Sequence, residues 1–168
     1  QLIYPEDVAV SSPWVHDYTF ETAPSDWAVE SGTWRVSSRW SCNPGWSWFA
    51  GVNQSGPALV STRQSYVGDI DVVTYVAAKM LPSGGGYSEV LTDVHFGCCA
   101  SSFGSDSGYR FVVGGKGNTW TGLLRNGQEV ATCDYKIPQT GIHNDWTRLT
   151  IRKRGAKVAL WVWDTPLL

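Results

Sequence analysis

Short runs in which apolar and polar residues alternate are the feature that most limits the fold of this chain. The clearest run spans residues 68–80, where Ile70 and Val72 fall on one face and Asp71 and Tyr75 fall on the other. Side chains alternate between two faces in this way in a β-strand. No segment shows the longer period of an extended helix, so the chain is predicted to consist of strands.

Turn residues separate these runs. Gly155 lies between the run that ends near Ile151 and the run that begins at Val158, and Asn126-Gly127 is typical of a two-residue hairpin turn. Loops are expected at residues 82–86 and 100–107. The remaining strands are expected at residues 14–20, 33–38, 46–52, 57–63, 90–98, 108–114 and 128–134.

Many short strands with turns between them predict an all-β fold, either a two-sheet antiparallel sandwich or a jelly roll. The chain has 168 residues, and a length of this order suits one domain with its own core. No repeat or linker divides it. We therefore expect a single domain over residues 1–168, with residues 1–13 as an N-terminal extension.

The composition is typical of an exported β-rich domain, with 10 Trp, 18 Gly and a single Met. The formal net charge is -2, and the one dense basic run, residues 152–154, adjoins Gly155 and fits a solvated hairpin tip. A nucleic-acid surface would need a larger basic cluster. No apolar run approaches the ~18 residues of a membrane span. We expect an extracellular or periplasmic protein with no nucleic-acid partner and no membrane span.

The four cysteines do not define a disulfide pattern by themselves. They allow three pairings, and they are Cys42, Cys98, Cys99 and Cys133. Cys98 and Cys99 are adjacent, so on a strand their side chains would point to opposite faces and would not share a partner. The spacing does not suggest a zinc site. One or two disulfides formed in an oxidising compartment and free buried thiols are both compatible with the sequence.

Several segments resemble concanavalin A-like, laminin-G-like jelly rolls. Residues 27–36 (WAVESGTWRV) are similar to the opening strands of that family, residues 68–72 (GDIDV) to a central strand, and residues 146–151 (WTRLTI) to a late hairpin. Residues 39–49 and 107–115 also resemble uncharacterised exported bacterial members of polysaccharide-handling systems. The resemblance implies a jelly roll, and the family includes lectins, carbohydrate-binding modules, glycosidases, lyases and adhesion domains.

The end of the chain departs from that family. Its members continue past the segment matching residues 160–168 with one or two further strands that close a sheet. An open edge beside Trp161 and Trp163 would be prone to pairing with other chains. We therefore expect the chain to be a fragment with a truncated C-terminal end, or another chain or segment to complete the sheet near Trp161–Leu168.

Four acidic residues are candidate catalytic groups. Glycoside hydrolysis uses a pair of carboxyl groups, and Asp69 and Asp71 share a strand face about 6.5–7 Å apart in Cα. Glucanases of this fold carry a third acid where this chain has Thr74. Glu89 and Asp93 form a looser pair without a motif. The incomplete triplet favours a non-catalytic domain, and these four acids are the candidates if the chain is a glycoside hydrolase or lyase.

The resemblance also implies that a loop-bound Ca²⁺ is compatible with the fold. The candidate ligands are Asp17, Asp106 and Asp164. None of them lies in a dense acidic loop, so the sequence predicts no cofactor.

Sugar binding has the best physical support. Pyranose rings present apolar C–H faces that stack on aromatic side chains, and Trp adds an N–H donor. Three tryptophans lie in one Gly/Ser/Pro-rich segment, and a fourth follows a loop with an amide and a guanidinium group nearby in the sequence. The candidate ligand-binding residues are Trp40, Trp46, Trp48, Trp120, Asn118 and Arg125.

The other tryptophans fit different places. Trp27, Trp34 and Trp146 match framework positions of the resemblance and are expected in the core. Trp161 and Trp163 lie on the strand face opposite Val158, Leu160 and Val162, as concave-face aromatics or as cover for a missing strand. The prediction is a non-catalytic carbohydrate-binding domain of an extracellular polysaccharide-handling protein. A glycoside hydrolase or lyase and a structural assembly subunit are the alternatives.

Overall fold

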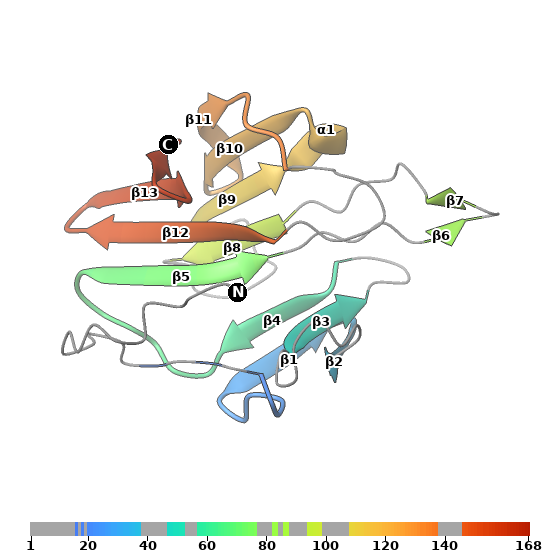
Figure 1. Cartoon of the computed structure of the whole chain (residues 1–168). Helices are drawn as coiled ribbons and strands as arrows, with labels where there is room; N and C mark the ends of the chain where they lie inside the picture. Colours follow the sequence, from blue (N-terminus) through green and yellow to red (C-terminus); the bar gives the residue numbers. More distant parts are fainter. Residues whose placement is uncertain are drawn as a thin grey trace. The chain divides into compact units, whose positions relative to one another are not determined.

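The computed structural model describes most of the chain. The described residues are 16, 18, 20–37, 47–52, 57–76, 82–83, 86–87, 94–98, 108–137 and 146–168. The chain forms two compact units, residues 1–64 and 65–168, and Figure 1 labels their strands β1 to β13. The described residues form antiparallel strands and one four-residue helix, so the all-β prediction is confirmed. None of the described segments is a helix that is long and apolar enough to cross a membrane.

The first unit contains two antiparallel strand pairs. They are β1 (Trp27–Ser31) with β4 (Leu59–Thr62), and β2 (Thr33–Ser37) with β3 (Trp48–Val52). An aromatic cluster joins them, with neighbouring ring centroids 5.2 to 6.1 Å apart. Its members are Tyr18, Phe20, Trp27, Trp34 and Phe49. None of the described residues of this unit is fully buried, and edge and stacking contacts between rings contribute to the packing among them.

The second unit contains two four-stranded antiparallel sheets. The first sheet has the order β14 (Thr165–Pro166), β13 (Lys157–Val162), β12 (Thr147–Arg154), β5 (Ile70–Val76). The second has the order β11 (Gln128–Cys133), β10 (Trp120–Arg125), β9 (Tyr109–Gly114), β8 (Val94–Cys98). Helix α1 (Gly115–Asn118) connects β9 to β10. Strands β6 (Pro82–Ser83) and β7 (Gly86–Tyr87) form a minimal hairpin.

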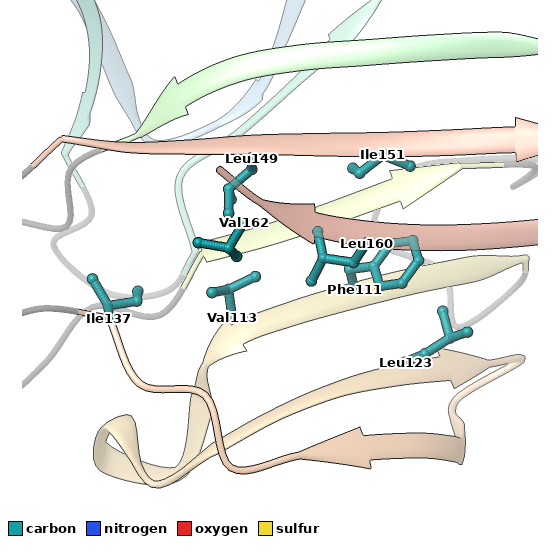
Figure 2. Packing of buried hydrophobic residues seen from close by; sticks show 8 residues of the cluster. All are labelled: Phe111, Val113, Leu123, Ile137, Leu149, Ile151, Leu160 and Val162. Carbon is teal, nitrogen blue, oxygen red and sulfur yellow. The ribbon is translucent and has the colours of Figure 1, made fainter. Parts of the chain in front are cut away.

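The two sheets pack face to face around an apolar core. Leu149 and Ile151 of β12 lie on the same face as Leu160 of β13, and all three point toward the sheet that holds Phe111 and Val113 (Figure 2). Phe111, Val113, Leu149 and Leu160 are fully buried. Burial of each such side chain contributes roughly 1.5–3 kcal/mol to folding. The second unit is therefore a two-sheet antiparallel sandwich, as predicted.

Alternation located most strands well. Strands β2, β3, β4, β8, β9 and β11 lie within the predicted ranges, and β5 lies inside the predicted run 68–80. The predicted loop at residues 82–86 instead contains β6 and the start of β7. The predicted strand at residues 14–20 is not formed at residues 16, 18 or 20, and Phe20 has a φ of 55°, which is incompatible with an extended strand.

The end of the chain lies along the edge of β13. The Leu160 N–H donates to the Leu168 carbonyl at 2.9 Å, and the Leu167 N–H donates to the Leu160 carbonyl at 2.8 Å. Thr165 and Pro166 pair with Val162 and Trp161. The expected open edge beside Trp161 is therefore covered at these positions by residues 165–168.

Candidate functional site

One face of the β5–β12–β13 sheet gathers aromatic and charged side chains. Leu149 and Ile151 point into the core, so the even-numbered residues of β12 point away from it. Residues that pair across antiparallel strands lie on the same face. The rows on this surface, which we call the outer face, are Tyr75–Arg148, Val73–Thr150–Trp161, Asp71–Arg152–Ala159 and Arg154–Lys157.

Trp163 extends this surface from the turn between β13 and β14. It occupies the first position of a two-residue turn, because Val162 pairs with Thr165. Its φ is 53°, in the left-handed region that costs a non-glycine residue about 1–2 kcal/mol. Its N–H donates to the Arg148 carbonyl at 2.9 Å. The turn therefore holds a bulky aromatic residue where Gly or Asn is usual.

The Trp163 ring is accessible and has aromatic and cationic neighbours. It is 49% exposed and meets Tyr75, which is 51% exposed, edge to face with centroids 6.2 Å apart. The Arg148 guanidinium carbon lies 5.7 Å from the Trp163 ring centroid, and Arg148 forms an ion pair with Asp164. This end of the outer face thus combines open ring surface with polar groups. We call Tyr75, Trp161 and Trp163 the aromatic patch.

A second cluster lies further along the same face. The Arg152 guanidinium carbon lies 4.6 Å from the Trp161 ring centroid. The Asp71 carboxylate lies 3.6 Å from Arg152 Nε and 2.8 Å from Arg154 Nη2. One carboxylate therefore positions two guanidinium groups, and one of these groups covers part of an indole.

The predicted catalytic acids do not form a catalytic pair among the described residues. Asp71 is held by two arginines, while Asp69 Oδ1 accepts a hydrogen bond from the Gly155 N–H at 2.7 Å. Both carboxylates therefore fasten β5 to the β12–β13 hairpin. Glu89 and Asp93 lie outside the described residues.

Of the three candidate calcium ligands, only Asp164 is among the described residues. Asp164 forms an ion pair with Arg148, whereas Asp17 and Asp106 lie outside the described residues. Within the described part of the chain, no group of three His, Cys, Asp or Glu side chains could hold a metal ion.

Trp120 lies on the outer side of the other sheet and packs against backbone. A Cβ atom added at Gly122 would come within 2.2 Å of its ring, and one at Gly115 within 2.8 Å. Lys116 Nζ lies over the ring at 4.5 Å from the centroid. The indole is partly buried, and its Nε1 has no acceptor among the described residues. These neighbours occupy ring surface of Trp120 that a sugar would need for stacking.

Asn118 and Arg125 do not lie beside Trp120 as a polar pair. Asn118 is 8% exposed, and its side chain donates to the Ile137 carbonyl and accepts from the Ile137 N–H, both at 2.8 Å. It thus fixes the segment after β11 to α1. Arg125 lies at the opposite end of β10 and is exposed, with its guanidinium 5.7 Å from the Tyr109 ring centroid.

The remaining tryptophans are distributed over the two units. Trp40 and Trp46 lie outside the described residues. Trp48 is partly buried on β3 of the first unit, opposite Ser37. The predicted core residues Trp27, Trp34 and Trp146 are each partly rather than fully buried. Trp34 lies against Gly51, where an added Cβ would come within 2.6 Å of the ring.

Only one cysteine side chain, that of Cys133, is among the described residues. Cys133 carries a free thiol and is partly buried on β11. Cys42 and Cys99 and the side chain of Cys98 lie outside the described part of the structure, so a disulfide among these three stays a prediction.

Sequence reasoning placed Trp161 and Trp163 on a non-core face but did not include them, or Tyr75, among the ligand-binding residues. The alternation within β5 and β13 carried the signal, because it assigned all three to faces opposite the core. The missing information was the strand pairing, since Tyr75 and Trp163 are separated by most of the second unit in sequence.

Protein-family models, curated proteins and solved structures were compared with this chain, and none of them matches it.

Proposed function

We propose that this chain is a non-catalytic carbohydrate-binding domain and that it binds its ligand on the aromatic patch of the outer face. The observation that carries the proposal is Trp163, an aromatic residue held in a left-handed turn conformation with half of its surface exposed. Strained backbone at a bulky residue is enriched at functional sites. We also propose that the protein is extracellular and that its fold is a jelly roll, as the resemblance implies.

The chemistry of the patch suits a sugar. The C–H face of a pyranose stacks on an indole or phenol ring, and rings that are already held in place lose little conformational entropy on binding. Trp163 and Tyr75 hold each other edge to face. Arg148 and Asp164 lie at the rim of these rings and offer donors and acceptors to hydroxyl groups.

A hydrolytic or lyase function has less support. General acid–base catalysis by a carboxyl pair needs one carboxyl that can accept and release a proton. Asp71 instead pairs with two arginine side chains, at 3.6 and 2.8 Å, and Asp69 accepts a hydrogen bond from the Gly155 N–H. No described contact favours the alternative of an assembly subunit.

The proposal is tested by binding of the full chain to a panel of soluble and insoluble polysaccharides. We expect Trp163→Ala and Tyr75→Ala to weaken the observed binding about tenfold or more, as loss of an aromatic anchor does. Tyr66→Ala is the matched control, because Tyr66 is an aromatic residue of similar exposure, 37%, outside the outer face.

Circular dichroism would establish that each variant is folded. Absence of binding across the panel, or equal binding by Trp163→Ala and the unaltered chain, would contradict the proposal. Release of reducing ends from a bound polysaccharide would instead favour the enzymatic alternative.

A further inference from the structure

The outer face carries an excess of positive charge although the chain as a whole is negative. Its strands contribute Arg148, Arg152, Arg154 and Lys157. The acidic groups are Asp71, Asp69, which precedes β5 on the same face and accepts from the Gly155 N–H, and Asp164 of the adjoining turn. The formal net charge of the whole chain is -2. Positive charge is thus concentrated on the surface that holds the aromatic patch.

Arg152 is the arginine of the outer face whose hydrogen-bonding groups are most available. Its guanidinium lies over the Trp161 ring at 4.6 Å, and its Nε faces Asp71 at 3.6 Å. The terminal Nη atoms have no acceptor among the described residues, and the side chain is 44% exposed. A guanidinium held in this way presents a planar fork that matches the two oxygens of a carboxylate or sulfate.

The two neighbouring arginines differ from Arg152 in this respect, whereas Lys157 does not. Arg154 donates to the carbonyls of Ile70 and Lys153 and pairs with Asp71, and Arg148 pairs with Asp164. Lys157 is exposed, lies in the row next to Arg152, and forms no ion pair with a described residue. Arg152 and Lys157 are therefore the two cations on this face that a ligand anion can reach without displacing a carboxylate of the protein.

We infer that the glycan bound on the outer face is acidic, with carboxylate or sulfate groups that Arg152 binds and Lys157 attracts. This inference rests on the proposed carbohydrate-binding function. Arg148 and Arg152 are four residues apart on β12, which corresponds to about 13 Å. A ligand that reaches both the Trp163 end and Arg152 must therefore be an oligosaccharide or polymer, with its sugar faces on the aromatic patch and an acidic group at the Arg152 fork.

The test compares ligands that differ in charge. Calorimetric titration of the full chain would use polygalacturonate oligosaccharides, the same oligosaccharides as methyl esters, dextran sulfate and unmodified dextran. We expect the free acid to bind about tenfold more tightly than its ester, the difference that one charge-assisted hydrogen-bonded pair produces. This preference should decrease as salt is raised, because the cations are exposed. Dextran sulfate against polygalacturonate distinguishes a sulfate ligand from a carboxylate ligand.

A matched pair of variants locates the contact. Arg152→Gln and Arg125→Gln each remove one positive charge from an exposed arginine that lies over an aromatic ring in the same unit. We expect Arg152→Gln to lose about tenfold in affinity for the acidic ligand and Arg125→Gln to remain within about twofold of the unaltered chain. Arg152→Lys should lose part of the affinity, since it keeps the charge but not the fork.

The outcomes separate this inference from the proposed function. If no glycan of any charge binds, the proposed function fails. If the free acid binds no more tightly than its ester and dextran sulfate binds no more tightly than dextran, carbohydrate binding stands and the acidic ligand is refuted. Equal losses in Arg152→Gln and Arg125→Gln would refute the assignment to Arg152. The two ligand comparisons, acid with ester and dextran sulfate with dextran, need no variant, so they decide the question even if Arg152→Gln does not fold.

Discussion

Trp163 has a left-handed backbone conformation that is unfavourable for a bulky residue, and about half of its surface is exposed to solvent. Its left-handed φ costs about 1–2 kcal/mol relative to an ordinary turn residue. Its cation–π contact with Arg148 stabilises the folded chain by about 0.5–1 kcal/mol, and its edge-to-face contact with Tyr75 by about 0.5–1.5 kcal/mol. The strain and the contacts nearly cancel, so Trp163 adds little to the free energy of unfolding. This is expected of a residue whose role is to bind a ligand.

Trp163→Gly is accordingly expected to leave the free energy of unfolding within about 1 kcal/mol of the unaltered chain, because relief of strain offsets the lost contacts. Glycan binding should fall about tenfold or more. Urea denaturation and calorimetric titration measure the two effects. Trp161→Gly is the control, since Trp161 lies within β13 and should lose stability. A large destabilisation by Trp163→Gly would mean that its role is structural.

Tyr135 gives the fold a dependence on alkaline pH. Burial raises the pKa of its phenol, and a hydrogen bond from Thr147 opposes this by lowering it. A pKa raised in the folded state means that the unfolded chain ionises first as pH increases. The contribution of this group to stability is thus present below pH 10 and is lost as pH rises through the higher folded value. Denaturation midpoints should fall less between pH 9 and pH 11 in Tyr135→Phe than in the unaltered chain; equal falls would contradict this.

At the scale of elements, β12 organises both the core and the outer face. It lies between β5 and β13, so its odd-numbered residues pack inward and its even-numbered residues carry the site. Alternation in the sequence predicted these faces correctly. It did not predict that β5 pairs with β12, because that pairing joins Tyr75 to Arg148 across a long separation in sequence. The aromatic patch could therefore not be assembled from the sequence, although each of its members was placed on a non-core strand face.

The sequence predicted that Asn118 lies beside Trp120 as a ligand-binding group, and the local backbone explains why it does not. The sequence showed Asn118 next to a tryptophan in a Gly-rich stretch, which is typical of a loop. The short helix α1 instead turns the Asn118 amide toward the Ile137 backbone. Neither the helix nor its distant backbone partner is visible in the local composition.

Asn118→Ala is expected to destabilise the chain by about 2–3 kcal/mol, because the buried N–H and carbonyl of Ile137 would lose their partners. Glycan binding should be unchanged. Thr119→Ala is the matched control, since its hydroxyl donates to the Lys116 carbonyl at an exposed position and its loss should cost less than about 1 kcal/mol. Thermal unfolding measures both. Loss of binding by Asn118→Ala without loss of stability would restore its predicted ligand role.

At the scale of the whole molecule, the two units differ in how they are packed. Every fully buried residue among those described belongs to residues 65–168. The described residues of the first unit are held by partly exposed aromatic rings and two strand pairs. The predicted single domain did not anticipate this contrast, because Trp is rarely fully buried even where it packs well, so its abundance does not distinguish a core from a partly exposed cluster.

Hydrogen–deuterium exchange should follow that contrast. Amides of β9, β10, β12 and β13, which surround the buried core, are expected to exchange most slowly. Amides of β1 to β4 should exchange faster, because fewer buried apolar contacts oppose their local opening. Mass spectrometry of peptic fragments measures both sets in one experiment. Equal protection in the two units would show that the aromatic cluster stabilises its strands as strongly as the sandwich core does.

The most direct test of the central claim is a nuclear magnetic resonance titration that follows the indole N–H signals, assigned by single Trp→Phe variants, as polygalacturonate oligosaccharide is added. The signals of Trp161 and Trp163 are predicted to shift together and to saturate with one dissociation constant, while the signal of Trp120 stays in place. Shifts confined to Trp120 or to tryptophans of the first unit, with Trp161 and Trp163 unmoved, would contradict the claim that the outer face of the β5–β12–β13 sheet binds the glycan.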